Sequence, residues 1–222
     1  MKRSEINQYL EEAKAFFKEY KFELPKWAYW SPEEWQEKGH ECDEIRKNAL
    51  GWDITDFGSG DYEQKGLFLF TIRNGDFHDP DCKKTYAEKI MISRENQVTP
   101  IHFHWNKMED IINRGGGDFV TKIWKADENE GLSDEKFTVQ IDGISTQVKG
   151  GDVIRLKPGE SISFESYIYH TFWAENGPAL IGEVSMVNDD ANDNRFYEPI
   201  GRFPEIEEDA PPVHLLCNEY PK

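Results

Sequence analysis

The strongest constraint on the fold is a long succession of short apolar runs between Trp52 and Val187, rich in β-branched and aromatic residues. Gly, Asn, Asp and Pro separate the runs, and no helical periodicity interrupts them. Asp142-Gly143 and Gly150-Gly151 provide the positive φ angles that tight hairpin turns need. Strands this numerous, without intervening helices, predict an all-β antiparallel sandwich or closed barrel. The predicted strands include residues 88–94, 99–105, 118–124, 137–141, 145–148, 152–156, 161–164, 169–173 and 179–187.

The first fifty residues have a different, helical pattern. Residues 4–20 place apolar side chains at helical spacing, which predicts an amphipathic helix with Ser4 as its N-cap. Ser31-Pro32-Glu33-Glu34 has the order of a capping box with a first-turn proline, so we expect a helix to about residue 38 and a short one over 43–49.

The chain of 222 residues is within the range that barrels occupy as one domain. We expect a single domain over 1–222. It comprises a helical extension (1–50), a β-barrel (51–188) and an irregular C-terminal arm (189–222), the last being rich in Asn, Asp and Pro.

The charge balance excludes several classes of partner. Asp and Glu number 43 against 26 Lys and Arg, which gives a formal charge of -17 and would repel nucleic acid and anionic lipid surfaces. The three cysteines lack C-x-x-C spacing, which fits a reducing cytoplasm. The N-terminus has no continuous apolar stretch like that of a signal peptide, and no segment of the sequence is apolar enough to predict a membrane span.

The chemistry-bearing feature is the pair His102 and His104 in a predicted strand. Side chains two residues apart on a strand project from the same face, so both imidazoles can reach one point. Glu109 follows a predicted turn and can return to the same ion, and His170 lies in a later aromatic-flanked strand. Three imidazoles and one carboxylate suit Mn, Fe, Co, Ni or Zn and leave coordination positions open. An isolated H-x-H pair is also common as ordinary surface or core histidines.

The segment from His102 to Gly116 resembles the first motif of the cupin superfamily, G-x5-H-x-H-x3-4-E-x6-G. Asn96 stands where the leading glycine is expected, and the spacing favours Glu109 over Asp110 as a ligand. The second motif is looser. Gly151, Pro158-Gly159 and His170 follow its order, with a longer gap before the histidine.

Longer sequence segments resemble the D-lyxose isomerases, a family of cupin sugar isomerases. This narrower resemblance covers nearly the whole chain. The resemblance implies a cupin-type jelly-roll barrel and a manganese-dependent homodimer. The implied reaction interconverts D-lyxose and D-xylulose, with slower action on D-mannose. The segments are Trp52–Phe57, Ala87–Met91, Glu95–His102, Glu109–Gly117, Gly182–Ser185 and Asn188–Asp190.

Aldose–ketose isomerisation moves a proton between C1 and C2 and needs a base and stabilisation of negative charge. Glu183 lies inside an apolar strand, so we expect it to be the proton shuttle, with a slightly raised pKa, unless it faces solvent. Lys107 lies between the metal histidines and Glu109 and is a candidate for stabilising oxyanion charge; the alternative is an exposed turn lysine.

The C-terminal arm supplies candidates for sugar binding. Asp193, Arg195 and Arg202 either reach over the barrel mouth to bind hydroxyls or only pin the arm. Trp105 and Trp173 neighbour ligands in strands and, by alternation, face away from them.

Three other functions share this ligand set. A cupin dioxygenase uses three histidines and a glutamate for iron. An archaeal-type phosphoglucose isomerase needs basic groups for a sugar phosphate, which the acidic composition disfavours. A non-catalytic sugar-binding cupin keeps the metal for stability.

Overall fold

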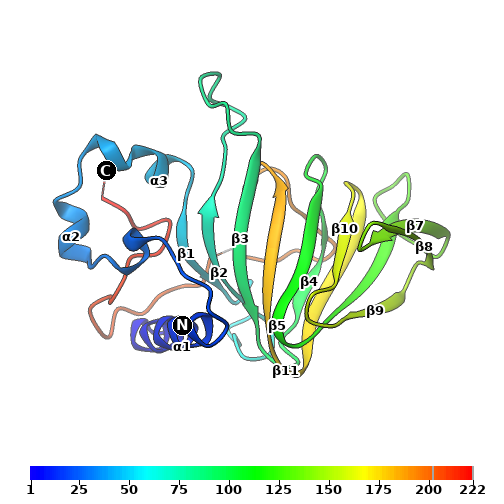
Figure 1. Ribbon diagram of the computed structural model, residues 1–222, viewed down its shortest axis with the longest axis horizontal. Coiled ribbons are helices and arrows are strands. Elements are labelled where there is room, and N and C mark those ends of the chain that lie inside the picture. Colours follow the sequence, from blue (N-terminus) through cyan, green and yellow to red (C-terminus); the bar gives the residue numbers. More distant parts are fainter. Residues whose placement is uncertain (202, 222) are drawn as a thin grey trace.

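The computed structural model describes residues 1–201 and 203–221 and is built mainly from antiparallel strands (Figure 1). The described strands form one hydrogen-bonded sheet along the path β1-β2-β3-β11-β5-β10-β7-β8, with β4, β6, β9 and β12 paired to its side. The expected all-β barrel with a helical N-terminus and an irregular C-terminal arm is confirmed. The strands are β1 (Gly51–Thr55), β2 (Leu67–Arg73), β3 (Tyr86–Ser93), β4 (Thr99–Phe103), β5 (Glu109–Ala126), β6 (Leu132–Ser133), β7 (Lys136–Ile141), β8 (Ile144–Lys149), β9 (Asp152–Leu156), β10 (Ser161–Phe164), β11 (Ile168–Met186) and β12 (Arg195–Phe196).

The N-terminal helices form where the capping signals predict them, with one shift. In the second predicted helix, the Ser31 hydroxyl accepts from the Glu34 amide at 3.2 Å and the Glu34 carboxylate accepts from the Ser31 amide at 2.8 Å. The first helix begins earlier than expected: Lys2, not Ser4, is its N-cap, and the Ser4 hydroxyl instead binds Asp209 at 2.7 Å. The helices are α1 (Arg3–Glu19), α2 (Pro32–Gln36) and α3 (Asp43–Lys47), with short 3-10 turns at Lys26–Tyr29 and His40–Cys42.

Two strands are longer than the sequence pattern predicts. Residues 118–124 are only the second half of β5, and the predicted strands 169–173 and 179–187 join in β11. Both long strands have a register shift where Gly115 and Gly116 face residues 179–180. This glycine-rich irregularity allows one strand to continue around the bend of the barrel.

One predicted hairpin is wrong. Asp142-Gly143 does connect the paired strands β7 and β8, but Gly150-Gly151 does not join a hairpin, because β9 pairs with β5 and not with β8. The second glycine pair therefore carries the chain across the barrel to a different neighbour.

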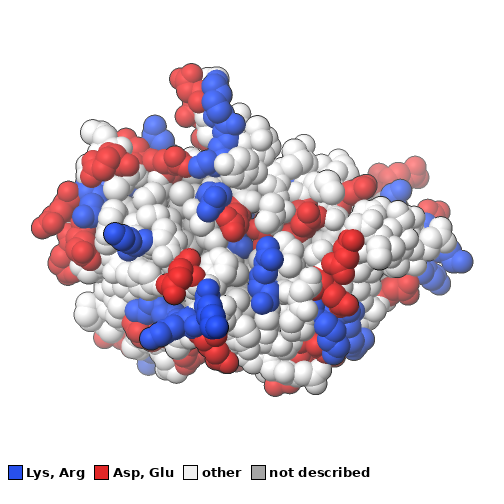
Figure 2. Space-filling view, viewed as in Figure 1, with Lys and Arg blue, Asp and Glu red and all other residues white. Residues whose placement is uncertain are grey.

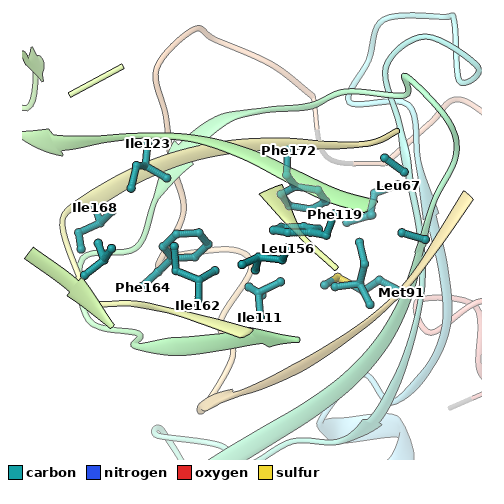
Figure 3. Packing of buried hydrophobic residues seen from close by; sticks show 14 of the residues in the cluster. Leu67, Met91, Ile111, Phe119, Ile123, Leu156, Ile162, Phe164, Ile168 and Phe172 are labelled. Carbon is teal, nitrogen blue, oxygen red and sulfur yellow. The ribbon is translucent and has the colours of Figure 1, made fainter. Parts of the chain in front are cut away.

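The barrel interior contains a tightly packed apolar cluster (Figure 3). Phe119, Ile162 and Phe164 are at most 1% exposed, and they come from β5 and β10. At about 25 cal/mol per Å² of buried apolar surface, each such side chain contributes on the order of 2 kcal/mol. This packing fixes the strands that carry the polar residues described below.

The outer face of β1, β2 and β3 is covered by α1. Ile6, Leu10 and Phe17 form one face of the helix, and they pack in a cluster that contains Trp52 and Phe70. The sheet is therefore buried on both faces here, which explains why β2 reads as a continuous apolar run rather than an alternating one.

The C-terminal arm is held by polar contacts with the N-terminus and with the barrel. The buried guanidinium of Arg3 forms ion pairs with Glu208, at 2.7 Å, and with Glu219. Nearer the barrel, Phe196 in β12 pairs with His102 in β4. The arm thus reaches the strand that carries the first histidine. Arg202, predicted to bind substrate, lies outside the described residues.

Surface charge is mixed on the face shown in Figure 2, with acidic side chains gathered over α2 and α3. Among the described helices, none is both long and apolar enough to cross a membrane.

Candidate metal centre and active site

Three histidines converge at one point inside the barrel. His102 and His170 are directly opposite each other on β4 and β11, and His104 follows the end of β4. The ligand atoms of the three rings all lie within 4.8 Å of one another. The sequence spacing of the H-x-H pair therefore corresponds to a shared position in space, and the long gap to His170 is closed by the β4–β11 pairing.

Each histidine ring is oriented by a backbone carbonyl. Nδ1 of His102, His104 and His170 donates to the carbonyl oxygens of Pro100, Asp193 and Ile168, at 2.8, 3.0 and 3.1 Å. A ring that donates from Nδ1 keeps the lone pair on Nε2 when it is neutral. Burial, together with the neighbouring His170 and His104 rings, holds the pKa of His102 well below its usual value, so this ring is neutral at pH 7.

Glu109, the first residue of β5, completes the group. Its Oε1 lies 3.2 Å from Nε2 of His170 and 3.5 Å from Nε2 of His104. Burial raises the pKa of this carboxyl, but the Lys107 ammonium and then His104 lower it by more. The net pKa is well below its usual value, so Glu109 is ionised. Asp110, the alternative ligand, points the other way: it is exposed and bonds Ser163.

The donor set fits a divalent metal ion. Nε2 of His104 is buried and, among the described residues, has no hydrogen-bond partner, which is a costly state for a polar atom unless a ligand occupies it. Neutral imidazole nitrogens and an ionised carboxylate oxygen are the donors that first-row divalent metals prefer. His102, His104, His170 and Glu109 are thus the residues able to hold a metal in this cavity.

Lys107 and Glu183 lie beside this group, and both line the same cavity. Nζ of Lys107 is 2.7 Å from Oε2 of Glu109 and 3.0 Å from Oε1 of Glu183. Both side chains are buried, so Lys107 is not an exposed turn lysine and Glu183 does not face solvent.

The expected pKa shift of Glu183 is wrong in sign. Burial raises the pKa, as expected, but the ammonium groups of Lys107 and then Lys89 lower it below its ordinary value. Lys89 is buried, pairs with Glu183 across β3 and β11, and places Nζ 3.2 Å from the same Oε1. The carboxylate form of Glu183, which a base requires, is therefore the stable one.

Sequence reasoning missed Lys89 and Asn188. The Asn188 side chain accepts from Lys89 at 2.6 Å and from Lys107 at 3.3 Å, so it fixes both ammonium groups. A lysine in an apolar strand directly opposite a buried glutamate is a signal visible only once the pairing of β3 and β11 is known.

Asp193 lies beside the site but is not among the described residues that line the cavity. Its carboxylate accepts from the amides of Asn106 and Lys107, at 2.8 and 2.9 Å, and it is 5% exposed. Its contacts hold the turn that carries Lys107. Arg195 lies 2.9 Å from Glu130, which fits the expectation that it pins the arm.

Trp105 and Trp173 are also absent from the described cavity lining, as strand alternation predicts. The indole of Trp105 donates to Glu130 at 2.7 Å and that of Trp173 to Glu175 at 3.0 Å. An aromatic ring from the arm contacts the site instead: Phe196 stacks on His102 with ring centroids 5.2 Å apart.

Comparison with solved structures identifies the fold. L-ribose isomerase from Acinetobacter sp. DL28 superposes with a TM-score of 0.62 at 14% identity, over 93% of this chain and 98% of that one. L-ribose isomerase from Geodermatophilus obscurus gives a TM-score of 0.62 at 16% identity with the same coverage. These identities are low, so the likeness concerns the barrel fold alone.

Sequence comparison gives closer relatives. The D-lyxose/D-mannose isomerase of Serratia proteamaculans is 50% identical over 99% of this chain and 98% of its own length. That of Escherichia coli O157:H7 is 48% identical with the same coverage. The model of the D-lyxose isomerase family matches residues 1–220. The chain belongs to the D-lyxose isomerase family.

Proposed function

We propose that this enzyme is a metal-dependent aldose–ketose isomerase that interconverts D-lyxose and D-xylulose, and D-mannose and D-fructose. The observation that carries the proposal is that three imidazoles, an ionised glutamate and a buried Lys107–Glu183 pair line one cavity. Relatives named D-lyxose/D-mannose isomerase, up to 50% identical along nearly the whole chain, support the choice of sugars.

The proton transfer is assigned to Glu183. As a carboxylate it accepts the proton from C2 of the open-chain aldose and returns it to C1, while the hydroxyl proton on O2 passes to O1. The aldehyde thus becomes an alcohol and C2 becomes the ketone, with no net gain or loss of protons. Both charged contacts of Glu183 among the described residues use Oε1. Oε2 is therefore the oxygen that we assign to the substrate proton.

Lys107 and the metal ligands have complementary tasks. The ammonium of Lys107 is held at the cavity by Glu109 and Glu183, where it stabilises negative charge that develops on the sugar oxygens. His102, His104, His170 and Glu109 would hold a divalent ion, which would supply Lewis acidity to the reaction. We propose manganese as that ion, following the family resemblance.

A sugar phosphate is a poorer fit than a free sugar. Among the described residues that line the cavity, the lysines are Lys89 and Lys107, and both already face Glu183. The described lining includes no arginine, so a phosphate dianion would lack a counter-charge there.

We also propose that residues 1–222 form one domain, that the protein is a homodimer and that it acts in the cytoplasm. The shared cluster of α1 with strands β1 and β2 supports the first statement. The second follows the family resemblance, and exposed Tyr86 and Met186, paired on β3 and β11, offer apolar surface for it. The three cysteines without C-x-x-C spacing support the third.

A panel of free aldoses and ketoses tests the function. The protein is stripped with a chelator, single divalent metals are added back, and the products are separated by chromatography. We expect turnover of D-lyxose and D-mannose to return with manganese. Inactivity on every sugar with every metal contradicts the proposal, and oxygen uptake in its place indicates a dioxygenase.

The Glu183→Gln variant tests the assigned base. We expect kcat for D-lyxose to fall by roughly 10²–10⁴-fold while bound metal stays at the wild-type level. Glu175→Gln removes a glutamate from the same strand outside the described cavity lining and is expected to leave kcat unchanged. Equal turnover by Glu183→Gln and wild type removes Glu183 from the mechanism.

A further inference from the structure

The hydroxyl of Thr99 is a buried polar group that forms no hydrogen bond within the described residues. Thr99 is the first residue of β4 and is 2% exposed. Its Oγ1 has no hydrogen-bond partner among the described residues. Burying an unpaired hydroxyl costs roughly 1–3 kcal/mol, so a valine of the same shape would serve the fold better. A ligand that forms a hydrogen bond with this hydroxyl would remove that cost.

Thr99 lines the cavity that contains the three histidines. Phe172 is its direct partner on β11, and the same lining includes the apolar side chains of Leu67 from β2 and Met91 from β3. Figure 3 shows Leu67 and Met91 toward one end of the apolar cluster and Phe172 next to Phe119. The other hydroxyl side chain in the described lining is Thr55, opposite Leu67, and its Oγ1 already accepts from the Phe57 amide at 2.9 Å. The Thr99 hydroxyl is therefore the one of the two that has no partner among the described residues.

The backbone of Thr99 is fixed, whereas no hydrogen bond among the described residues holds its hydroxyl. The hydroxyl of Thr171 donates to the Thr99 carbonyl at 2.6 Å, and the register shift between His170 and Phe172 sets how β4 meets β11. Rotation of χ1 by about 120° exchanges the methyl and hydroxyl groups of a threonine. Such a rotation needs no movement of the strand.

The spacing from the histidines fits the length of a sugar. Thr99 pairs with Phe172, two residues along β11 from His170. At about 3.3 Å per residue, this places Thr99 on the order of 6–7 Å from the histidine pair along the strand. When C1 and C2 of an open-chain pentose lie at the histidines, the rest of its carbon chain spans a comparable distance.

We propose that Thr99 is a substrate-binding residue that hydrogen-bonds the terminal hydroxyl of the open-chain sugar. This inference rests on the proposed isomerase function and adds to it the recognition of the end of the sugar remote from the reacting carbons. The hydroxyl that is unpaired in the protein alone becomes paired in the complex, so its burial favours sugars that carry a partner for it.

The Thr99→Val variant tests this assignment, because valine keeps the shape and removes only the hydroxyl. We expect kcat/KM for D-lyxose to fall at least roughly 10-fold, while the midpoint of thermal unfolding stays equal or rises. Thr99→Ser keeps a hydroxyl and is expected to retain most of the wild-type kcat/KM. A lower unfolding midpoint with unchanged kcat/KM assigns Thr99 a structural role and overturns the inference.

Ser93→Ala is the matched control. Ser93 is also buried, and its hydroxyl also lacks a hydrogen-bond partner among the described residues, but it is not in the described lining of the cavity. Its loss is expected to leave kcat/KM unchanged. A decrease in kcat/KM as large as that of Thr99→Val overturns the inference. It would mean that loss of a buried hydroxyl lowers kcat/KM by disturbing the core and not by removing a contact with the substrate.

The deoxy sugar 5-deoxy-D-lyxose separates binding of the terminal hydroxyl from other effects. The wild-type enzyme is expected to lose about the same factor in kcat/KM on this sugar as Thr99→Val loses on D-lyxose. The variant itself is expected to treat the two sugars alike. If Thr99→Val still prefers D-lyxose by the wild-type ratio, the inference is overturned. If the wild type turns over neither D-lyxose nor D-mannose with any metal, the proposed function fails and the inference with it.

Discussion

The carbonyl oxygen of Asp193 lies 3.0 Å from Nδ1 of His104 and joins the C-terminal arm to the candidate metal centre. The carboxylate of the same residue holds the amides of Asn106 and Lys107. One arm residue thus orients a candidate metal ligand through its backbone carbonyl, and it holds the turn that carries Lys107 through its side chain. The arm is therefore part of the site even though Asp193 does not belong to the described cavity lining.

Asp193→Ala is expected to weaken metal binding by roughly 10–100-fold, because supporting groups of this kind have effects of that size. The substitution removes the acceptor of the Asn106 amide and of the buried Lys107 amide, and it lets the arm carbonyl move away from His104. The dissociation constant for manganese is measured by calorimetry. Glu198→Ala removes an exposed carboxylate from the same arm and should leave the constant unchanged. Wild-type affinity in Asp193→Ala contradicts the positioning role.

Lys89→Met is expected to destabilise the protein by about 1–3 kcal/mol. Removing one partner of a buried ion pair costs roughly 3–5 kcal/mol when the other charge is left alone, but Glu183 retains Lys107. The free energy of unfolding in urea measures the change, with Lys125→Met as the control for loss of an exposed lysine on β5. A stability equal to that of the wild type would mean that Lys89 does not pair with Glu183.

Gly116→Ala is expected to destabilise the protein by at least about 2 kcal/mol more than Gly143→Ala. Both glycines have positive φ, +84° and +74°, so both alanines carry the cost of a left-handed backbone. Only at Gly116 would the new Cβ meet another atom, the Pro178 carbonyl oxygen at 2.2 Å. This clash would push β5 and β11 apart where their register shifts. Equal unfolding midpoints for the two variants would contradict this account of the bend.

The protein is expected to become less stable as the pH is lowered, and His214 contributes to this loss. Burial lowers the pKa of His214 from 6.5, and the nearby Lys14 ammonium acts in the same direction. The unfolded chain therefore binds this proton more readily, so the contribution is complete above about pH 6.5 and is lost as the pH falls toward the folded-state pKa. Each unit by which the folded-state pKa of His214 lies below its unfolded value contributes about 1.4 kcal/mol to the free energy of unfolding.

Urea unfolding at about pH 7.5 and about pH 5.5 measures this effect. His214→Gln can replace the hydrogen bond to the Trp30 carbonyl without titrating. The variant is expected to lose less stability than the wild type between the two conditions. A larger loss in His214→Gln would reverse the predicted sign.

Local sequence patterns predicted the fold class and the histidine-glutamate group, because strand alternation and motif spacing act over a few residues. His102, His104 and Glu109 lie within one such stretch. The position of Glu183 inside an apolar strand likewise predicted burial, which the structure bears out at 4% exposure.

The residues that sequence reasoning missed depend on which strands pair and in which register. Lys89 reaches Glu183 only because β3 and β11 are neighbours, and Thr99 joins the cavity at a register shift opposite Phe172. The sign of the Glu183 pKa shift was missed for the same reason, since burial alone raises it and the unseen second lysine reverses it. The false hairpin at Gly150-Gly151 shows the same limit: a turn signal does not specify the partner of the next strand.

Measurement of bound metal per chain tests the central claim most directly. Elemental analysis and manganese titration are carried out on the wild type and on His102→Ala and His104→Ala. We predict one tightly bound divalent ion per chain in the wild type, loss of that ion in both variants, and D-lyxose isomerisation only where the ion is bound. D-lyxose turnover by metal-free protein, or full metal content in either variant, would contradict the assignment of these residues as the metal centre of a sugar isomerase.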